Sequence, residues 1–135
     1  MKQKILLITA LVLMLTYGCK TEQIDTDLLK NKEVAVVYHK LNPADIDAIL
    51  SDNFIGRNEK SRHTWNRDDH RTYLSNGDFK VDTIFSQVAE GDWVATRFAR
   101  KFILNGDTVM FEAMHFKRFE NGKIAEIWEY GDTQQ

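Results

Sequence analysis

Phe119-Glu120-Asn121-Gly122-Lys123 and the earlier Leu104-Asn105-Gly106-Asp107 decide how this chain folds. An Asn-Gly pair between strand-forming residues predicts a two-residue β-hairpin, because both turn positions take positive φ angles that Asn and Gly reach at the least steric cost. Two such turns join three consecutive strands into an antiparallel meander. The turns also fix the register, and so determine which side chains share a face.

Counting outward from the two turns predicts the partners across the sheet. The predicted pairs are Leu104 with Asp107, Arg100 with Phe111, Glu120 with Lys123, His115 with Trp128, and Ala113 with Tyr130. One face then collects aromatic side chains and a few polar ones. Its members are Phe98, Arg100, Phe102, Val109, Phe111, Ala113, His115, Lys117, Phe119, Ile124, Glu126, Trp128, Tyr130 and Asp132. Helices should cover this face, so its polar groups must pair with one another or face a cavity.

Helical patterns come first in the chain and strand patterns second. Apolar spacing predicts a helix from about 27 to 41 and a short one over 44–50, and Asn66 is expected to cap a third over 67–75. Residues 57–64 are expected to form a charged loop. Strands are predicted over 80–88, 93–104, 108–119 and 123–130. Helices followed by an antiparallel meander predict an α+β domain.

The N-terminus has the pattern of an export signal. Lys2 and Lys4 precede an apolar run over residues 5–17 that is short for a membrane-spanning helix, and Gly18 precedes Cys19. The pattern resembles the lipobox of bacterial lipoproteins, which implies that Cys19 becomes a lipidated first residue. The alternative is an ordinary signal peptide, or an uncleaved anchor, with an incidental cysteine.

These patterns divide the chain into three parts. They are a signal peptide over 1–18, the lipidated Cys19 with a polar tether over 19–26, and one domain over 27–135. A lipid anchor would hold the domain at a membrane of the bacterial cell envelope, on the periplasmic or the outer surface.

The composition excludes two classes of function. Cys19 is the only cysteine, so a lipidated Cys19 leaves no thiol for a disulfide, a Cys-ligated metal or a nucleophile. The chain has 18 Lys and Arg against 20 Asp and Glu, and loss of Lys2 and Lys4 leaves 16 against 20. This mildly acidic balance lacks the basic footprint of a nucleic-acid partner.

Two longer motifs carry a family resemblance. They are Ala89-Glu90-Gly91-Asp92-Trp93-Val94-Ala95, and the hairpin from Phe116-Lys117-Arg118-Phe119 to Glu126-Ile127-Trp128. With the order of the elements, they resemble the SnoaL-like polyketide cyclases of the nuclear transport factor 2-like superfamily over most of residues 27–132. The resemblance implies a cystatin-like cone of curved sheet around about three helices, with a deep pocket and no cofactor. Because the superfamily includes cyclases, ketosteroid isomerases, epoxide hydrolases, dehydratases and binding domains, function has to be argued from the pocket.

The candidate catalytic residues are His115 and Asp132. The resemblance implies that His115 stands where ketosteroid isomerases have an acid that stabilises an oxyanion. It also implies that Asp132 matches a late-strand carboxylate that SnoaL-like cyclases use as general acid or base. Burial would raise the pKa of Asp132 and suit proton abstraction beside a carbonyl, whereas a solvated strand end is the alternative. Arg100 could pair with Asp132, bind an acidic ligand, or serve only as a structural salt bridge.

The candidate substrate contacts are aromatic or polar residues near the expected pocket. They are Tyr38, His63, Trp65, Arg100, Trp128 and Tyr130. His63 and Trp65 suit stacking and polar anchoring of a small hydrophobic molecule if their loop covers a cavity, and an exposed loop is the alternative. Tyr38 and Tyr130 carry hydroxyls that need partners when buried, although both could simply fill the core. No metal is expected, because the sequence lacks the helical His and Glu pairs that hold zinc.

Three functions remain open at this stage. The chain could be a cofactor-free cyclase or isomerase acting on a small hydrophobic or carbonyl-containing molecule, a non-catalytic ligand-binding lipoprotein, or a protein-interaction module. The outer face of the sheet, where apolar residues alternate with charges, predicts a homodimer through the convex surface. Its apolar members are Met110, Met114, Phe116 and Ile127.

The lipid anchor makes a direct prediction. Cys19→Ser removes the only residue that can be lipidated in the lipobox, so the protein should leave the membrane fraction and appear in the soluble fraction. Immunoblotting of fractionated cells measures this. Retention of the variant in the membrane at the wild-type level would exclude Cys19 as the anchor.

Overall fold

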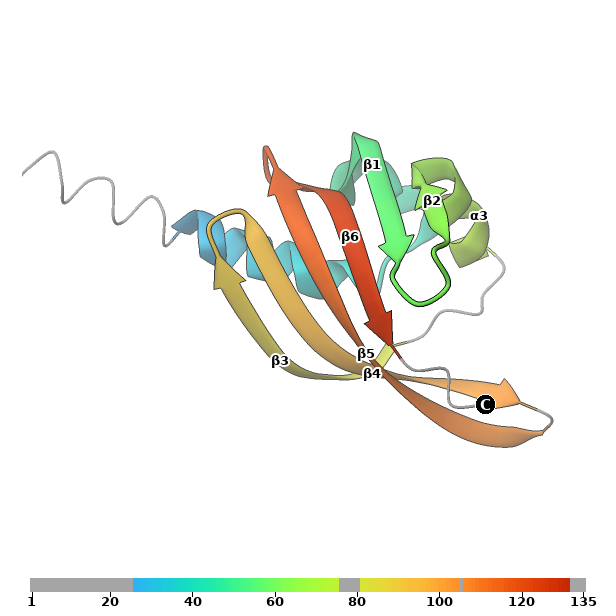
Figure 1. Ribbon diagram of the computed structural model, residues 1–135. Helices are drawn as coiled ribbons and strands as arrows, with labels where there is room; N and C mark the ends of the chain where they lie inside the picture. The colour runs from blue at the N-terminus through green and yellow to red at the C-terminus, as the bar shows by residue number, and fades with distance from the viewer. Residues whose placement is uncertain (1–25, 76–80, 105, 132–135) are drawn as a thin grey trace, which may run out of the picture.

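The computed structural model describes residues 26–75, 81–104 and 106–131 (Figure 1). The expected signal peptide, Cys19, the start of the tether and Asp132 lie outside these residues. Within the described ranges, no helix is long and apolar enough to cross a membrane.

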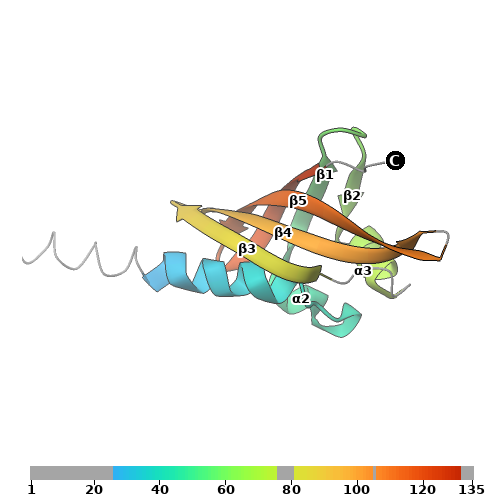
Figure 2. The same cartoon turned by 90° about the horizontal axis from the view of Figure 1, so that it is seen from below.

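Helices precede and interrupt a single six-stranded sheet. A helix over residues 26–38 is followed by η1 (Pro43–Asp45), α2 (Ile46–Ile49), β1 (Leu50–Asn58), β2 (Thr64–Asn66), α3 (Arg67–Ser75), β3 (Val81–Glu90), β4 (Trp93–Leu104), β5 (Asp107–Glu120) and β6 (Lys123–Gly131). The strand order is β2-β1-β6-β5-β4-β3, and within the part of the chain that the structure describes only β1 and β6 pair in parallel. The sheet curves, and the helix over 26–38 lies along one side of it (Figure 2). This confirms the predicted α+β fold.

The strands β1 and β2 were not predicted, and they extend into the two ends of the loop expected over 57–64, so that only residues 59–63 lie between them. β1 contains Asp52 and Asn53, which are poor strand formers, yet it pairs with β6 along one edge and with β2 along the other. Asp52 and Asn53 lie where the register with β6 is interrupted, between Leu50 and Ile55. The pairing of the rest of β1 with β6, which is distant in sequence, is not visible in local sequence patterns.

The predicted register is right beside each turn and wrong further along β6. Leu104 pairs with Asp107 and Glu120 with Lys123, as predicted. Between Phe119 and Arg118, however, the partner in β6 changes from residue 124 to residue 126. One extra residue in β6, which is a β-bulge, therefore displaces every later pair by one position.

The bulge moves the side chains of β6 to the opposite face from the one predicted. His115 pairs with Glu129 instead of Trp128, and Ala113 pairs with Gly131 instead of Tyr130. Because successive residues of a strand point to opposite faces, a shift of one residue exchanges the two faces completely. Glu129 consequently joins the inner face.

The same shift corrects an expected ion pair. The register counted from the Asn121-Gly122 turn also predicts Lys117 opposite Glu126, as a cross-strand ion pair, but Glu126 accepts from Arg57 and Arg118 on the outer face, both at 3.2 Å. Lys117 is fully buried on the inner face, where its Nζ lies 3.0 Å from Nε2 of His39.

The core lies between the inner face of the sheet and the helices. It contains Tyr38 and Ala35 of the first helix, Ile46 of α2, and apolar residues of β1, β4, β5 and β6. α3 begins with the predicted cap, since Oδ1 of Asn66 accepts from the backbone N–H groups of Asp68 and Asp69, each at 2.9 Å. Oδ2 of Asp69 accepts in return from the N–H of Asn66 at 3.0 Å, which completes a capping box and fixes where α3 starts.

Gly56 in β1 is required by the position of Trp65. A Cβ atom at residue 56 would lie 2.0 Å from Cε2 of the Trp65 ring, far inside van der Waals contact. The indole therefore covers the backbone of β1, and only glycine leaves it the space.

This contact predicts a conditional loss of stability. Gly56→Ala should lower the free energy of unfolding by about 1–3 kcal/mol, because Trp65 must move. In a Trp65→Ala background the same change should cost much less, since the clash is gone. Urea unfolding of the four proteins measures both costs, and an equal cost in the two backgrounds would contradict the packing.

Candidate functional site

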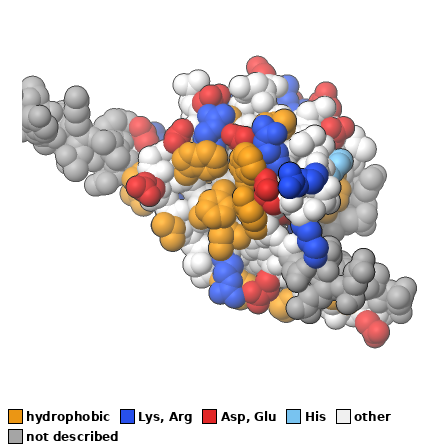
Figure 3. All heavy atoms as spheres, in the orientation of Figure 1, with side chains coloured by type: hydrophobic (Ala, Val, Ile, Leu, Met, Phe, Trp, Pro, Cys, Tyr) orange, Lys and Arg blue, Asp and Glu red, His pale blue; other side chains and the backbone are white. Residues whose placement is uncertain are grey.

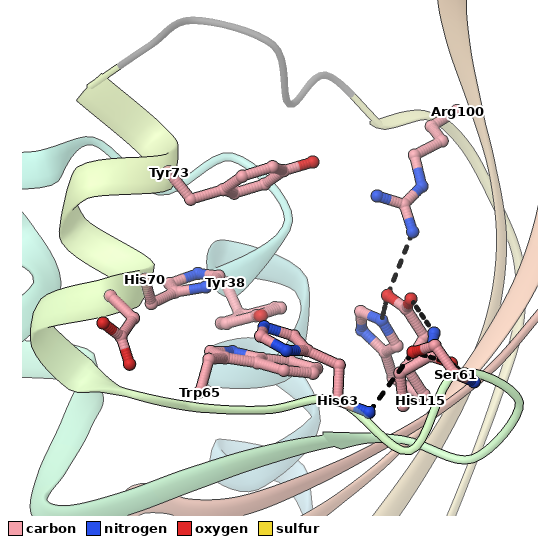
Figure 4. Close-up of a pocket in the computed structure, with 11 residues that line it drawn as sticks. Tyr38, Ser61, His63, Trp65, His70, Tyr73, Arg100 and His115 are labelled. Atoms are coloured by element: carbon pink, nitrogen blue, oxygen red, sulfur yellow. Dashed lines mark hydrogen bonds and ion pairs between the residues drawn. The ribbon is translucent and has the colours of Figure 1, made fainter.

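A cavity of about 320 Å³ lies between α3, the segment joining β1 to β2, and the inner face of the sheet (Figure 4). Its lining residues are Tyr38, Asn58, Ser61, His63, Trp65, Asp69, His70, Tyr73, Arg100, His115 and Glu129. This volume is typical of a small-molecule pocket. Five of the candidate residues from the sequence meet there, namely Tyr38, His63, Trp65, Arg100 and His115.

Trp128 and Tyr130 do not line this cavity. The bulge in β6 places them on the convex face, where they lie with Trp93 and Phe116 in a separate shallow depression. Their predicted place in the pocket depended on the register that the bulge overturns. Asp132, the other candidate from this part of the chain, lies outside the described residues.

The polar end of the cavity is built around Glu129. Its Oε2 accepts a hydrogen bond from Nε2 of His115 at 2.8 Å and from Nη2 of Arg100 at 3.0 Å. Its Oε1 accepts from Nδ2 of Asn58 at 2.9 Å. The three donors come from β5, β4 and β1, so the carboxylate of β6 is held from both sides by its neighbours in the sheet.

The pKa values indicate which groups of this network carry charge. Burial opposes ionisation of Glu129, but the hydrogen bond and charge of His115, the charge of Arg100 and the hydrogen bond from Asn58 outweigh it and lower the pKa of Glu129 to about 2. Burial lowers the pKa of His115 to about 4 against the opposing hydrogen bond to Glu129. At neutral pH the network therefore contains an ionised Glu129, a charged Arg100 and a neutral His115.

The neutral state fixes the tautomer of His115. An ionised carboxylate can only accept hydrogen bonds, so the proton of the imidazole must be on Nε2. Nδ1 then carries a lone pair, and it is buried without a hydrogen-bond partner among the described residues. His115, one of the residues that line the cavity, thus has one ring nitrogen held by Glu129 and the other buried with no partner among the described residues.

Arg100 makes an ion pair and also contacts an aromatic ring. It forms an ion pair with Glu129, and its guanidinium lies 5.0 Å from the ring centre of Phe111. The carboxylate that it meets in the described structure belongs to Glu129.

Aromatic rings form the other wall of the cavity. His70 of α3 stacks on Tyr38 with ring centres 5.2 Å apart, and His63 stacks on Trp65 at 6.1 Å. Nε1 of Trp65 and Nε2 of His70 are buried and have no hydrogen-bond partner among the described residues. In native proteins such atoms generally bind water or a ligand. Figure 4 shows the rings of His70 and Tyr73, both of α3, on the other side of the cavity from Arg100.

Four important lining residues were missed in the sequence. Glu129 was assigned to the outer face because the bulge was not expected, and Asn58 lay in the presumed loop. His70 and Tyr73 of α3 were not among the candidate contacts. For His70, the capped start of α3 gave a usable signal, because His70 and Leu74 are one turn apart and both are buried.

The buried histidines predict a loss of stability in acid. Burial lowers the pKa values of His70 and His115 to about 4 in the folded protein, and it lowers that of His39 as well. Because the unfolded chain binds these protons near pH 6.5, the free energy of unfolding should fall as the pH drops from 7 to 5, by about 1–2 kcal/mol per histidine. Glu129 should add a further loss below about pH 4.5, since its pKa is lowered to about 2.

Urea unfolding at several pH values measures this dependence. His70→Phe keeps a ring against Tyr38 but cannot be protonated, so its stability should fall less between pH 7 and 5 than that of the wild type. A wild-type stability that is constant over this range, or the same slope in both proteins, would contradict the account.

Structural comparison shows the same fold in several solved proteins. A protein of unknown function with a cystatin-like fold from Xanthomonas campestris matches with a TM-score of 0.63 and 23% identity, covering 77% of this chain and 92% of that one. An LEH-like epoxide hydrolase from M. tuberculosis matches with a TM-score of 0.65 and 19% identity, covering 78% and 84%. A putative SnoaL-like polyketide cyclase from Jannaschia sp. CCS1 matches with a TM-score of 0.65 and 11% identity, covering 78% and 87%.

Sequence comparison assigns the family. No curated protein matches the chain. The family model described as SnoaL-like polyketide cyclase matches residues 31–135, which include all the strands and the whole lining of the cavity. The chain therefore belongs to the SnoaL-like polyketide cyclase family.

Proposed function

We propose that this protein binds a small, uncharged, largely hydrophobic molecule in the cavity and transfers a proton to or from it without a cofactor. The observation that carries the proposal is the buried pair of His115 and Glu129, whose atoms Nε2 and Oε2 are 2.8 Å apart. Family members include proteins described as a polyketide cyclase, and solved structures of this fold include one described as an epoxide hydrolase. These relatives support acid/base chemistry as a class and do not identify the substrate.

His115 is the proposed proton acceptor. Glu129 is a poor base, because its three hydrogen bonds stabilise the ionised form and lower its pKa to about 2. Nδ1 of His115, by contrast, has a lone pair and no partner among the described residues. When His115 takes a proton, the adjacent carboxylate of Glu129 stabilises the imidazolium that forms, while the hydrogen bond at Nε2 keeps the ring in place.

The charges of the site favour an uncharged ligand. The positive charge of Arg100 is balanced by Glu129 at 3.0 Å, so the polar end of the cavity has no excess charge to offer an ion. Nε1–H of Trp65 is a buried donor and Nδ1 of His115 a buried acceptor. A molecule with a planar apolar body, a carbonyl to accept from Trp65 and an acidic C–H or O–H for His115 would satisfy both groups.

Binding without chemistry is the second candidate, and one observation favours it. Burial lowers the pKa of His115 to about 4, whereas a general base works best with a pKa near the working pH. His115 would then act as a hydrogen-bond acceptor that selects ligands and would never take the proton. The two candidates share the cavity and differ only in proton transfer.

Export, anchoring and dimer formation belong to the same proposal. The lipobox pattern at Cys19 supports a lipoprotein of the bacterial cell envelope, and the balance of charge gives no reason to expect a nucleic-acid partner. The convex face supports a homodimer, because Trp93, Phe116, Trp128 and Tyr130 gather there in an apolar patch. Figure 3 shows hydrophobic side chains grouped on this face of the sheet with charged ones around them.

The test begins with the ligand. The full protein, extracted with detergent from its own host, should carry a small molecule that native mass spectrometry detects and that His115→Phe retains poorly. Arg97→Gln is the matched control, because Arg97 lies on the outer face of the sheet in an exposed ion pair with Glu112 at 2.7 Å. This variant should retain the molecule at the wild-type level.

Proton transfer then separates the two candidates. In D₂O the wild type should exchange a C–H hydrogen of the recovered molecule, or convert the molecule to an isomer, and NMR detects both. Glu129→Gln should slow this step by about 10²–10⁴, the range for general acid/base groups. A bound molecule that wild-type protein leaves unexchanged and unconverted would exclude the enzyme and support binding alone, and an empty cavity would contradict both.

A further inference from the structure

Asn58 joins two parts of the site that are otherwise separate. It is the last residue of β1, and its Cα pairs with that of Glu129 in the neighbouring parallel strand β6. The chain then turns through residues 59–63 at the side of the cavity before it enters β2. Asn58 therefore lies between the buried carboxylate and the loop that contributes Ser61 and His63 to the cavity lining.

The side chain of Asn58 is bonded on both sides at once. Its amide Nδ2 donates to Oε1 of Glu129 at 2.9 Å. Its Oδ1 accepts from the backbone N–H of Ser61 at 2.8 Å and from the Ser61 hydroxyl at 3.0 Å. Since the amide group is rigid and planar, a rotation that breaks one set of bonds must disturb the other.

The loop is tied to the same two residues through its backbone. The N–H of Asn58 donates to the carbonyl of His63 at 2.9 Å, and the N–H of Glu59 donates to the carbonyl of Glu129 at 3.1 Å. The hydroxyl of Ser61 accepts in turn from the N–H of His63 at 3.3 Å. A continuous chain of hydrogen bonds thus runs from His115 through Glu129, Asn58 and Ser61 to the residue that stacks on Trp65.

We propose that Asn58 is a positioning residue that couples the hydrogen bonding of Glu129 to the conformation of the loop over residues 59–63. The hydrogen bonds at the polar end of the cavity and the conformation of the loop beside it then change together. A ligand that displaces the loop alters how Glu129 is held, and through it the orientation of His115. The inference rests on the proposed function only in treating the cavity as a ligand site, because the coupling itself is a property of the free protein.

The test uses a residue that does not contact Glu129. Ser61→Ala removes the hydroxyl bonded to Asn58 and leaves Asn58 itself intact. The full protein in detergent micelles is measured in two ways, by hydrogen exchange of the amides in residues 59–63 and by ¹³C NMR titration of the Glu129 carboxyl. Coupling predicts faster exchange in the loop together with a rise in the pKa of Glu129, because Asn58 is then held less firmly against it.

Asn58→Ala should also speed exchange in the loop and raise the pKa of Glu129, and both changes should be larger than in Ser61→Ala. Exchange at the amides of Glu59 and Ser61 should be about tenfold faster, and the pKa of Glu129 should rise by about one unit, the scale of one lost hydrogen bond to a charged group. Asn53→Ala is the matched control. Asn53 also lies on β1 and also donates to a glutamate, Glu120 at 3.5 Å, but in an exposed position, so its loss should change neither measurement.

One result would overturn the coupling. If Ser61→Ala speeds exchange in the loop and leaves the pKa of Glu129 at the wild-type value, the loop and the carboxylate are independent. Asn58 would then bond to each of them without transmitting a change from one to the other. Neither measurement requires a ligand or turnover. Failure to find a ligand would therefore count against the proposed function alone, and an unchanged Glu129 would count against the coupling alone.

Discussion

The whole site depends on one extra residue in β6. The second Asn-Gly turn starts the β5–β6 hairpin with Glu120 opposite Lys123, and the bulge that follows moves the partner of His115 from Trp128 to Glu129. Without the bulge, an indole would face the helices and a carboxylate would face outward. With it, the inner face receives the carboxylate and the outer face receives the aromatic rings. The chemistry of the cavity and the apolar patch of the convex face are two consequences of the same irregularity.

A buried carboxylate is costly unless several donors surround it, and the sheet supplies them. His115 and Arg100 reach Glu129 from β5 and β4, and Asn58 reaches it from β1 because β1 runs parallel to β6 beside it. Each donor is fixed by a strand that is itself part of the core. The network therefore holds His115 in a known tautomer, whereas burial of the ring is what lowers its pKa and leaves it neutral. Its Nδ1 is unpaired among the described residues.

The parts of this structure that could be predicted from the sequence are those governed by local chemistry. The turn at Asn121-Gly122, the strand pairs beside both predicted turns, the Asn66 cap and the α+β order follow from residues within a few positions of one another. The inward positions of Arg100 and His115 also follow, because β4 and β5 keep an uninterrupted register. These predictions are confirmed.

The parts that could not be predicted depend on contacts that are distant in sequence. The bulge has no marker in β6, where Ile124-Ala125-Glu126 reads as ordinary strand, and so Glu129 was placed on the wrong face. β1 forms because β6 offers it a parallel edge, although Asp52 and Asn53 disfavour a strand. The predicted register pairs Lys117 with Glu126 across the strands, and only the packed structure shows its amine buried beside His39.

Disulfide trapping tests the bulge most directly. Cross-strand partners have Cα atoms within reach of a disulfide, whereas side chains on opposite faces do not meet. His115→Cys combined with Glu129→Cys should therefore form a disulfide readily under mild oxidation, and His115→Cys combined with Trp128→Cys should not, in proteins shown by circular dichroism to be folded. Ready cross-linking of the second pair and failure of the first would contradict the account, because Glu129 would then point away from the cavity.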